Sequence, residues 1–294
     1  MPHTIPETVR GPRIAVVVVT VNSRADAERN LGELGAQEGV ELEIVFVDNG
    51  STDGTLDVLE GRPEVTLIAN GENRWLSPAW AQGVRASSAP FVLFLTPDVR
   101  LIDRFCLRRL HDALAARPHA ALAGPTLADE GGRDLRNGAF AFPSPLYLAL
   151  QAVGLSGVLR RDRLPPPLHF AGEEPRGVPF VNGCCMLVRR EALEAIGGLD
   201  ERYRLYWEEI DLARRLSDAG FEILLAPGVR AVHRGKGSPA RERLREEAWG
   251  FGERLYVRKH HGVAADLLIR SLRVVERGRR ALRRSARPPA GPDA

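Results

Sequence analysis

The chain has 294 residues, of which 44% are hydrophobic and 27% are charged, and its formal net charge is +3. This composition is typical of a globular protein and excludes a disordered chain, a collagen-like fibre and a small disulfide scaffold. The charge is too small to indicate a nucleic-acid-binding protein. The length suffices for one large α/β domain or for two closely packed half-domains.

The cysteines indicate a reducing compartment, and the apolar runs indicate a protein without a membrane span. Cys184 and Cys185 are adjacent and Cys106 stands alone, which suits neither a disulfide framework nor a zinc site. The sequence starts without a charged segment followed by an apolar one, and the longest apolar runs are far shorter than the ~20 residues of a membrane span. We therefore expect a cytoplasmic protein, with peripheral contact to the inner face of the cell membrane as an option.

Buried strands alternate with helices in the first third of the chain, as the uninterrupted β-branched run at 14–20 illustrates. The expected strands are 14–20, 42–47, 65–68 and 91–95, and the expected helices are 25–37, 56–59 and 77–87. Short links between such elements predict a doubly wound α/β sheet, with the ligand site beyond the carboxyl ends of the strands.

The second part of the chain is less regular. Residues 129–178 are rich in Gly, Pro and Arg, which predicts an insertion or loop over the sheet that recognises an acceptor. The elements expected around this segment are a helix at 104–116, a strand at 120–123, a strand leading into a helix at 180–190, a helix at 207–216, strands at 222–225 and 229–233, a helix at 239–261 and a basic amphipathic segment at 264–286.

Acidic residues and one histidine stand where strands end or helices begin. Asp48 and Asp98 follow expected strands, His233 ends a late strand, and Glu208, Glu209 and Asp211 stand at a helix start. Each has an ordinary structural alternative, because a carboxylate can hold a turn, cap a helix or favour the positive end of a helix dipole. Together they suit a nucleoside diphosphate substrate with a carboxylate-held cation and a general base.

The ordered set of motifs resembles a family 2 glycosyltransferase with a GT-A fold, in the rhamnosyltransferase-like branch of bacterial cell-surface polysaccharide synthesis. The resemblance runs from about residue 14 to 261. The motifs are Val18 to Ser23, Val47 to Thr55, Leu95 to Val99, Gly183 to Arg190, Gly197 to Glu201, Glu208 to Leu212 with Arg215, and Val232-His233.

The resemblance implies a Rossmann-like, doubly wound mixed sheet flanked by helices, with a C-terminal helical extension. Within one GT-A domain it implies a nucleotide-sugar-binding half at 14–98 and an acceptor-binding and catalytic half at 99–238, with a variable loop region at 129–178. A tail at 1–13 would precede them, and helices with a basic tail at 239–294 would follow.

The resemblance also implies roles for individual residues. Glu209 stands where the family usually has an aspartate as general base, with Asp211 and Glu208 as rivals, and Asp98 and His233 would hold Mn²⁺ or Mg²⁺. The reaction would invert the anomeric centre of the transferred sugar. The residues implied around the nucleotide are Thr20, Asn22, Asp48, Asn49, Ser51, Asp53 and Asn73, and those implied at the acceptor are Trp207, Asn182 and Gly183.

Three departures from the family pattern leave a second function open. Glu209 replaces the usual aspartate, Trp75 stands where a glycine is common, and Ala81 stands where an asparagine is common. The alternative is a weak or inactive member that binds nucleotide sugars or scaffolds an assembly. A nucleotidyltransferase is a third possible function, but it requires a Gly-rich, basic phosphate-binding loop after the first strand. Residues 21–24 do not have that composition.

The sequence leaves several sugar donors and several acceptors open. The branch favours thymidine-diphospho-rhamnose, with uridine-diphospho-hexoses close behind, and the acceptor is a saccharide, a lipid-linked sugar or a small molecule. Arginines crowd the segment 264–287 beside apolar residues, which suits either an anionic membrane surface or a solvated tail helix. Nucleic acid is not expected as a partner.

Overall fold

The computed structural model describes residues 11–153, 167–168, 170, 172–235 and 242–285. The chain divides into two compact units. The first comprises Met1–Ala141 and Pro167–Gly252, and the second comprises Phe142–Pro166 and Glu253–Ala294.

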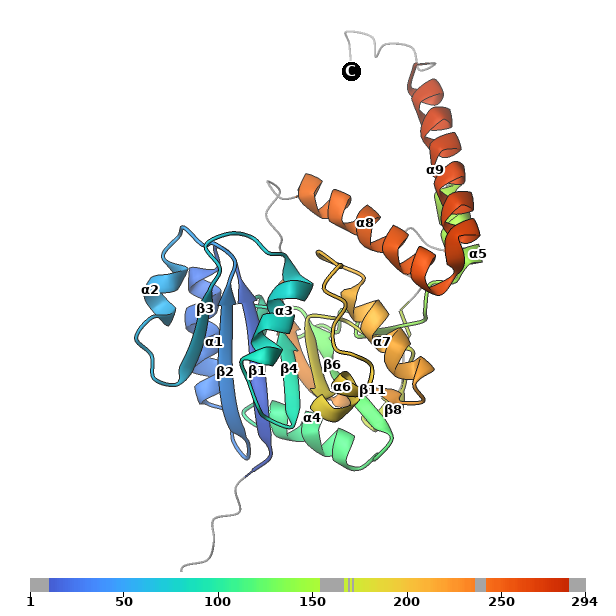
Figure 1. The fold of residues 1–294 in the computed structure, drawn as a ribbon. Coiled ribbons are helices and arrows are strands. Elements are labelled where there is room, and N and C mark those ends of the chain that lie inside the picture. Colours follow the sequence, from blue (N-terminus) through green and yellow to red (C-terminus); the bar gives the residue numbers. More distant parts are fainter. Residues whose placement is uncertain (1–10, 154–166, 169, 171, 236–241, 286–294) are drawn as a thin grey trace, which may run out of the picture. The chain divides into compact units, whose positions relative to one another are not determined.

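The described residues of the first unit form a nine-stranded mixed sheet in the order β3-β2-β1-β4-β10-β6-β11-β5, with β8 paired to β11 (Figure 1). β10 runs antiparallel to β4 and β6, whereas β1 to β4 are mutually parallel neighbours. The strands are β1 (Arg13–Thr20), β2 (Glu41–Asp48), β3 (Val65–Ala69), β4 (Phe91–Leu95), β5 (Val99–Arg100), β6 (Ala120–Ala128), β8 (Arg176–Gly177), β10 (Cys185–Arg189) and β11 (Glu222–His233). A separate small sheet pairs β7 (Ala139–Phe140) with β9 (Phe180–Val181).

Helices cover both faces of the large sheet. The first unit contains α1 (Arg24–Gly35), α2 (Thr55–Leu59), α3 (Leu76–Arg85), α4 (Cys106–Ala115), α6 (Arg190–Ala195), α7 (Glu208–Asp218) and the first half of α8 (Glu242–His260). Side chains alternate across a strand, so Val16 of β1 packs in the core with Leu31 of α1 and Leu110 of α4, while Val17 faces Gly83 of α3. This two-sided burial explains the continuous apolar run of β1.

The register brings the carboxyl ends of neighbouring strands together at one edge of the sheet. Thr20 at the end of β1 pairs with Asp48 at the end of β2, which in turn pairs with Ala69 at the end of β3. The loops that follow these strands therefore start side by side, as expected for a doubly wound sheet. The expected mixed α/β architecture is confirmed.

Several element boundaries differ from the sequence-based expectations. β6 continues to Ala128, and the two late strands are one strand, β11, whose register shifts between Ala226 and Arg230 because the Pro227-Gly228 step interrupts regular pairing. Where it is described, segment 129–178 contains β7, β8 and the helix α5 (Pro145–Ala152), so it is not a continuous loop. The expected helix at 239–261 begins at Glu242 in the structure, and positions 236–241 lie outside the described residues.

The described part of the second unit is helical. It contains α5, the second half of α8 and α9 (Gly262–Ser285), and α5 packs against α9. Arg273 of α9 forms an ion pair with the buried Glu253 of α8. Among the described helices, none combines the length and the apolar character that crossing a membrane requires.

Candidate active site

Asp48 organises the loop that follows β2. Its carboxylate accepts hydrogen bonds from the hydroxyls of Thr20 and Ser51 and from the backbone N–H groups of Gly50 and Ser51. Thr20 and Asp48 are 0% and 1% exposed, so both lie beneath the loop surface. The pair therefore fixes the ends of β1 and β2 relative to each other.

Asn22 and Asp53 tie the loops after β1 and β2 to each other. The Asn22 side-chain oxygen accepts a hydrogen bond from the backbone N–H of Thr52 at 2.7 Å, and the Asp53 carboxylate accepts one from the N–H of Arg24 at 3.1 Å. Burial raises the pKa of Asp53, but hydrogen bonds from Thr55 and Arg24 outweigh it and hold the pKa below its ordinary value. Asp53 is thus an ionised anchor between the starts of α1 and α2.

Three amide side chains extend this network towards α3. Asn49 donates to the backbone carbonyl of Trp75 at 3.0 Å and accepts from Asn70 at 2.9 Å. Asn73 accepts a hydrogen bond from the N–H of Trp75 at 2.9 Å. Trp75, at the N-terminal end of α3, has a φ of 69°, which is uncommon for a bulky residue. The segment that carries Asn73 and Trp75 is therefore held in one particular conformation.

A cleft of about 650 Å³ lies at this edge of the sheet. Its volume is in the range of small-molecule sites. It is lined by Val19, Val21, Asn22, Ser23, Asp26, Asn49, Asn73, Trp75, Leu76, Thr96, Pro97, Asp98, Leu205, Leu244 and Arg245. The cleft brings together three of the expected nucleotide-binding residues and one of the expected metal ligands.

Asp98 and His233 face each other across two strands. His233 at the end of β11 pairs with Val99 of β5, and its Nε2 lies 3.1 Å from Oδ2 of Asp98. The hydroxyl of Thr96 donates to the other Asp98 oxygen at 2.8 Å. Burial raises the pKa of Asp98, but the hydrogen bond and charge of His233 outweigh it, so the pKa lies below its ordinary value. The residues are 135 positions apart in the chain, and the sheet alone brings them together.

Glu208 and Glu209 are the first residues of α7, and both carboxyl groups bind a proton more tightly than usual. Burial raises the pKa of Glu208 well above its ordinary value, and the charge of Glu209 adds to the effect. Burial also raises the pKa of Glu209, to about 7. Within the described part of the chain, Oε2 of each residue is buried without a hydrogen-bond partner. A carboxylate whose pKa is close to 7, and which has an oxygen without a hydrogen-bond partner, is suited to accept a proton.

Asp211 is occupied differently. It is 0% exposed, and its carboxylate accepts hydrogen bonds from the Tyr203 hydroxyl at 3.2 Å and from Arg215 at 2.8 Å. Arg215 in turn donates to the carbonyls of Ile196 and Gly198. Asp211 therefore fastens α7 to the preceding turn and leaves neither oxygen free for a substrate.

The expected acceptor residues fall into two groups. A Cβ on Gly183 would lie 3.0 Å from Cβ of Glu209, so the missing side chain lets this backbone approach the glutamate. The Asn182 side chain accepts from the N–H of Cys184 and donates to the carbonyl of Asn137. Trp207 is 0% exposed and packs against the Trp249 ring, and its expected place at the acceptor stays a prediction. Burial was invisible in the sequence because it depends on how α8 packs over this tryptophan.

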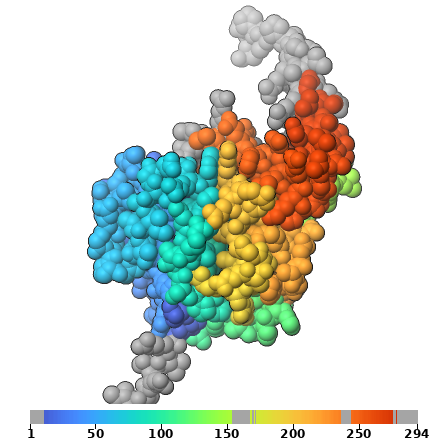
Figure 2. Space-filling view, in the orientation of Figure 1, coloured from blue at the N-terminus to red at the C-terminus, as the bar shows by residue number. Residues whose placement is uncertain are grey.

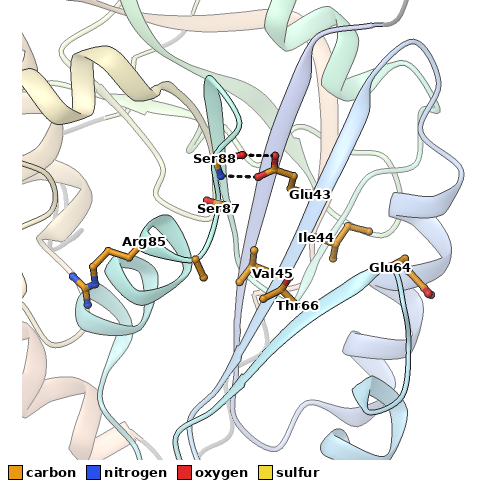
Figure 3. Close-up of a pocket in the computed structure, with 9 residues that line it drawn as sticks. Glu43, Ile44, Val45, Glu64, Thr66, Arg85, Ser87 and Ser88 are labelled. Atoms are coloured by element: carbon orange, nitrogen blue, oxygen red, sulfur yellow. Dashed lines mark hydrogen bonds between the residues drawn. The ribbon is translucent and has the colours of Figure 1, made fainter.

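A second hollow lies near the beginning of β2, at the opposite edge of the sheet from Asp48 (Figure 3). Glu43 there accepts hydrogen bonds from the backbone N–H and the hydroxyl of Ser88, and from the N–H of Ala89. Burial raises the pKa of Glu43, but these bonds outweigh it and hold the pKa below its ordinary value. Glu43 thus joins β2 to the start of β4, which is a structural task.

The protein-family model described as "Glycosyl transferase family 2" matches residues 15–197. The chain belongs to glycosyl transferase family 2. The match covers more than half of the chain and includes the loops around Asp48 and Asp98. The chain is accordingly a glycosyltransferase, and the resemblance noted in its sequence is confirmed.

Known relatives of this family 2 glycosyltransferase act on several kinds of molecule. The chain is 30% identical over 249 residues to an N-acetylglucosaminyl-diphospho-decaprenol L-rhamnosyltransferase of Mycobacterium tuberculosis (strain ATCC 25618 / H37Rv), with 78% of each chain covered. It is 28% identical over 240 residues to validoxylamine A glucosyltransferase of Streptomyces hygroscopicus subsp. jinggangensis, covering 76% of this chain and 56% of the relative.

A solved structure confirms the GT-A fold expected of a family 2 glycosyltransferase. The mannosyltransferase PcManGT from Pyrobaculum calidifontis, in complex with GDP-Man and Mn²⁺, superposes with a TM-score of 0.54 at 18% identity. The superposition covers 92% of this chain and 81% of that chain.

Sequence reasoning did not find every residue that lines the cleft. Leu205, Leu244 and Arg245 line the cleft, although no motif marks them. Tyr206 and Trp207 both have positive φ immediately before α7, a feature that only a structure reveals for non-glycine residues. Figure 2 shows the teal segment that includes α3 beside the yellow segment that includes residues 200–204. The Ser77 hydroxyl of α3 donates to the carbonyl of Asp200, and Arg85 of α3 forms an ion pair with Glu201.

Proposed function

We propose that the chain transfers a sugar, with inversion and with help from a divalent cation, from a nucleoside diphosphate sugar to an acceptor hydroxyl. The observation that carries this proposal is the convergence of Asn22, Asn49 and Asn73 with Asp98 in one cleft. Leu205 in the same cleft lies four positions before Glu209, whose pKa is raised to about 7. The cleft and the proposed proton acceptor are thus linked by a segment of four positions in the chain.

The nucleotide is proposed to bind over the loops after β1 and β2. Asp48 would accept a hydrogen bond from the ring N–H of the base when the Ser51 hydroxyl turns away from it. Thr20 and Asp53 would act by holding these loops, since both are committed to hydrogen bonds within them. The 30% identical rhamnosyltransferase supports thymidine-diphospho-rhamnose as the donor to be tested first.

Asp98 and His233 fit a divalent cation by their donor types. One carboxylate and one imidazole are ligands that Mn²⁺ accepts, and Mg²⁺ usually adds substrate phosphate oxygens and water to one or two carboxylates. The described residues contain no group of three or more His, Cys, Asp or Glu side chains that could hold a metal ion. Diphosphate oxygens and water would therefore complete the ligand set. A bound cation would neutralise the charge of the leaving diphosphate.

Glu209 is proposed as the general base. Its carboxylate would take the proton of the acceptor hydroxyl, and the resulting oxygen nucleophile would attack the anomeric carbon opposite the leaving diphosphate. The new glycosidic bond forms as the bond to the diphosphate breaks. Asp211 is a weaker candidate because Tyr203 and Arg215 occupy its oxygens. Glu208 is a weaker candidate because burial raises its pKa well above the ordinary value and so disfavours the charged form that accepts a proton.

Calorimetric titration with thymidine and uridine diphosphates, each with and without Mn²⁺, tests this proposal. We expect Mn²⁺-dependent binding of one nucleotide, lost in Asp98→Ala. The matched control is Asp112→Ala, which removes an exposed aspartate that pairs with Arg108 and His111 of α4. Absence of binding under all conditions would refute the transferase proposal. Nucleotide binding without sugar transfer to any acceptor tried would favour a binding or scaffolding protein.

A lipid-linked acceptor at an anionic membrane surface is part of the proposal. Five large apolar residues of α9 are about half or more exposed: Val263, Leu267, Leu268, Val274 and Val275. Successive helical residues are rotated by about 100°, so these positions share one side of α9, whereas Ile269 on another side is buried. Exposed Arg270 and the arginines that follow in the sequence supply positive charge for anionic lipid headgroups.

Sedimentation with lipid vesicles tests the membrane contact separately. We expect the protein to bind vesicles that contain phosphatidylglycerol and not vesicles of phosphatidylcholine alone, and to lose binding in Leu267→Glu/Leu268→Glu. The control is Ile102→Glu, because Ile102 is equally exposed but belongs to the first unit. Equal binding by the double variant would refute the assignment of α9.

A further inference from the structure

The turn before α7 has a backbone conformation that needs support from its surroundings. Tyr206 and Trp207 have φ angles of 70° and 74°, in the left-handed region that bulky residues rarely adopt. Glu208 and Glu209 follow directly as the first residues of α7. Strained conformations of this kind persist only where neighbouring groups fix them, and they concentrate at functional sites.

The first half of α8 supplies that support. The Trp249 ring lies 5.3 Å from the Tyr206 ring and 5.5 Å from the Trp207 ring, measured between centroids. Gly252 lies against the backbone of the same turn. A Cβ at Gly252 would lie 2.8 Å from the Tyr206 carbonyl oxygen and 2.9 Å from Cδ1 of Trp207.

Gly252 has a local comparison in Gly250. Both glycines are inside α8, where glycine lowers helix stability. A Cβ at Gly250 would meet no atom within 4 Å, so nothing in the packing requires a glycine there. Only Gly252 is explained by a close approach to another segment.

The same half of α8 also reaches the donor cleft. Leu244 and Arg245 line the cleft, and Phe251 packs on the Arg204 guanidinium at 4.6 Å. Arg204 lies at 5.3 Å over the ring of Trp75, and its backbone carbonyl accepts a hydrogen bond from the N–H of Leu76 at 2.7 Å. Segment 204–207 is thus fastened at one end to the donor cleft and leads at the other end into α7.

We propose that Gly252 and Trp249 are positioning residues, which hold the Tyr206–Trp207 turn and thereby set where Glu209 points. The inference rests on the proposed role of Glu209 as general base. A displacement of α7 by about 1 Å would move the carboxylate away from the acceptor hydroxyl, and misplacements of this size cost ~100-fold in rate. Asn22, Asn49 and Asp98 of the donor cleft follow β1, β2 and β4 and not α7, so nucleotide affinity is expected to be retained.

The test compares Gly252→Ala with Gly250→Ala, which make the same change on one helix. We expect Gly250→Ala to keep kcat within about twofold and to melt at or above the wild-type temperature, because alanine favours helix. We expect Gly252→Ala to lose at least ~10-fold in kcat, in line with a sub-ångström displacement of the base. Its nucleotide affinity should stay within about threefold, and the alkaline-rising limb of its pH profile should move.

Two outcomes would overturn the inference. One is that Gly252→Ala behaves like Gly250→Ala. The other is that kcat and nucleotide affinity of Gly252→Ala fall together, in proportion to the unfolded fraction. Trp249→Leu provides a second perturbation of the turn without the added Cβ, and the same kcat loss at retained affinity is expected. If Glu209→Gln keeps wild-type kcat, the base assignment itself fails. If Glu209→Gln is inactive while both α8 variants are normal, only the positioning role fails.

Discussion

Replacing Glu209 by glutamine removes a proton-binding group whose pKa the fold raises from 4.5 to about 7. The cause is burial, which disfavours the charged carboxylate more than the hydrogen bonds of the α7 start favour it. Glutamine has nearly the same shape as protonated glutamic acid and never ionises. The substitution therefore removes this ionisation, together with the part of the raised Glu208 pKa that the charge of Glu209 causes.

The folded protein binds the Glu209 proton more tightly than the unfolded chain does. The resulting stabilisation is fully present below pH 4.5 and is lost as the pH rises through about 7. At 1.36 kcal/mol per pH unit, the whole loss is about 3 kcal/mol. Relative to wild type, Glu209→Gln should thus gain about 3 kcal/mol of unfolding free energy between pH 4.5 and pH 8. If the glutamine amide itself lowers the unfolding free energy, it does so equally at every pH, so this effect cancels when the two pH values are compared.

Urea unfolding of both proteins at several pH values between 4.5 and 8 measures this difference. In parallel, sugar transfer by wild type should rise with pH along a limb centred near 7, and Glu209→Gln should transfer at least ~100-fold more slowly. A stability difference that does not change with pH would refute the raised pKa. A limb near pH 7 that persists in Glu209→Gln would show that another group is the base.

Two further predictions concern the framework that holds the site. Gly83→Ala would place a Cβ 2.2 Å from Cγ1 of Val17 and should lower the unfolding free energy by ~1–3 kcal/mol, whereas Gly32→Ala on open helix surface should raise it by up to ~1 kcal/mol. Denaturant titration of both variants checks this, and equal effects would contradict the packing of α3 on β1. Asp211→Ala leaves Arg215 without its buried partner and should lower the unfolding free energy by ~3–5 kcal/mol. A variant as stable as wild type but inactive would instead identify Asp211 as the catalytic group.

The strand and helix pattern was predictable because each element carries a local signature. The run from Ile14 to Val19 is apolar without a break, and a strand buried on both faces requires just that. Asp48 and Asp98 could be placed at the expected edge, because parallel strands deliver their carboxyl ends to the same side. The boundaries of β11 were less accessible, since a bulge at Pro227 changes register without ending the strand.

The sequence by itself determined the fold class, the family and the residue types available for chemistry. These follow from local periodicity and from motifs whose order along the chain is specific. Only the tertiary structure showed how the three acids at the start of α7 are buried and which partners they have. Asp211 is bound by Tyr203 and Arg215, and Glu209 lies against Gly183 with a raised pKa. Burial and partner choice depend on segments far apart in the chain, so no local pattern could reveal them.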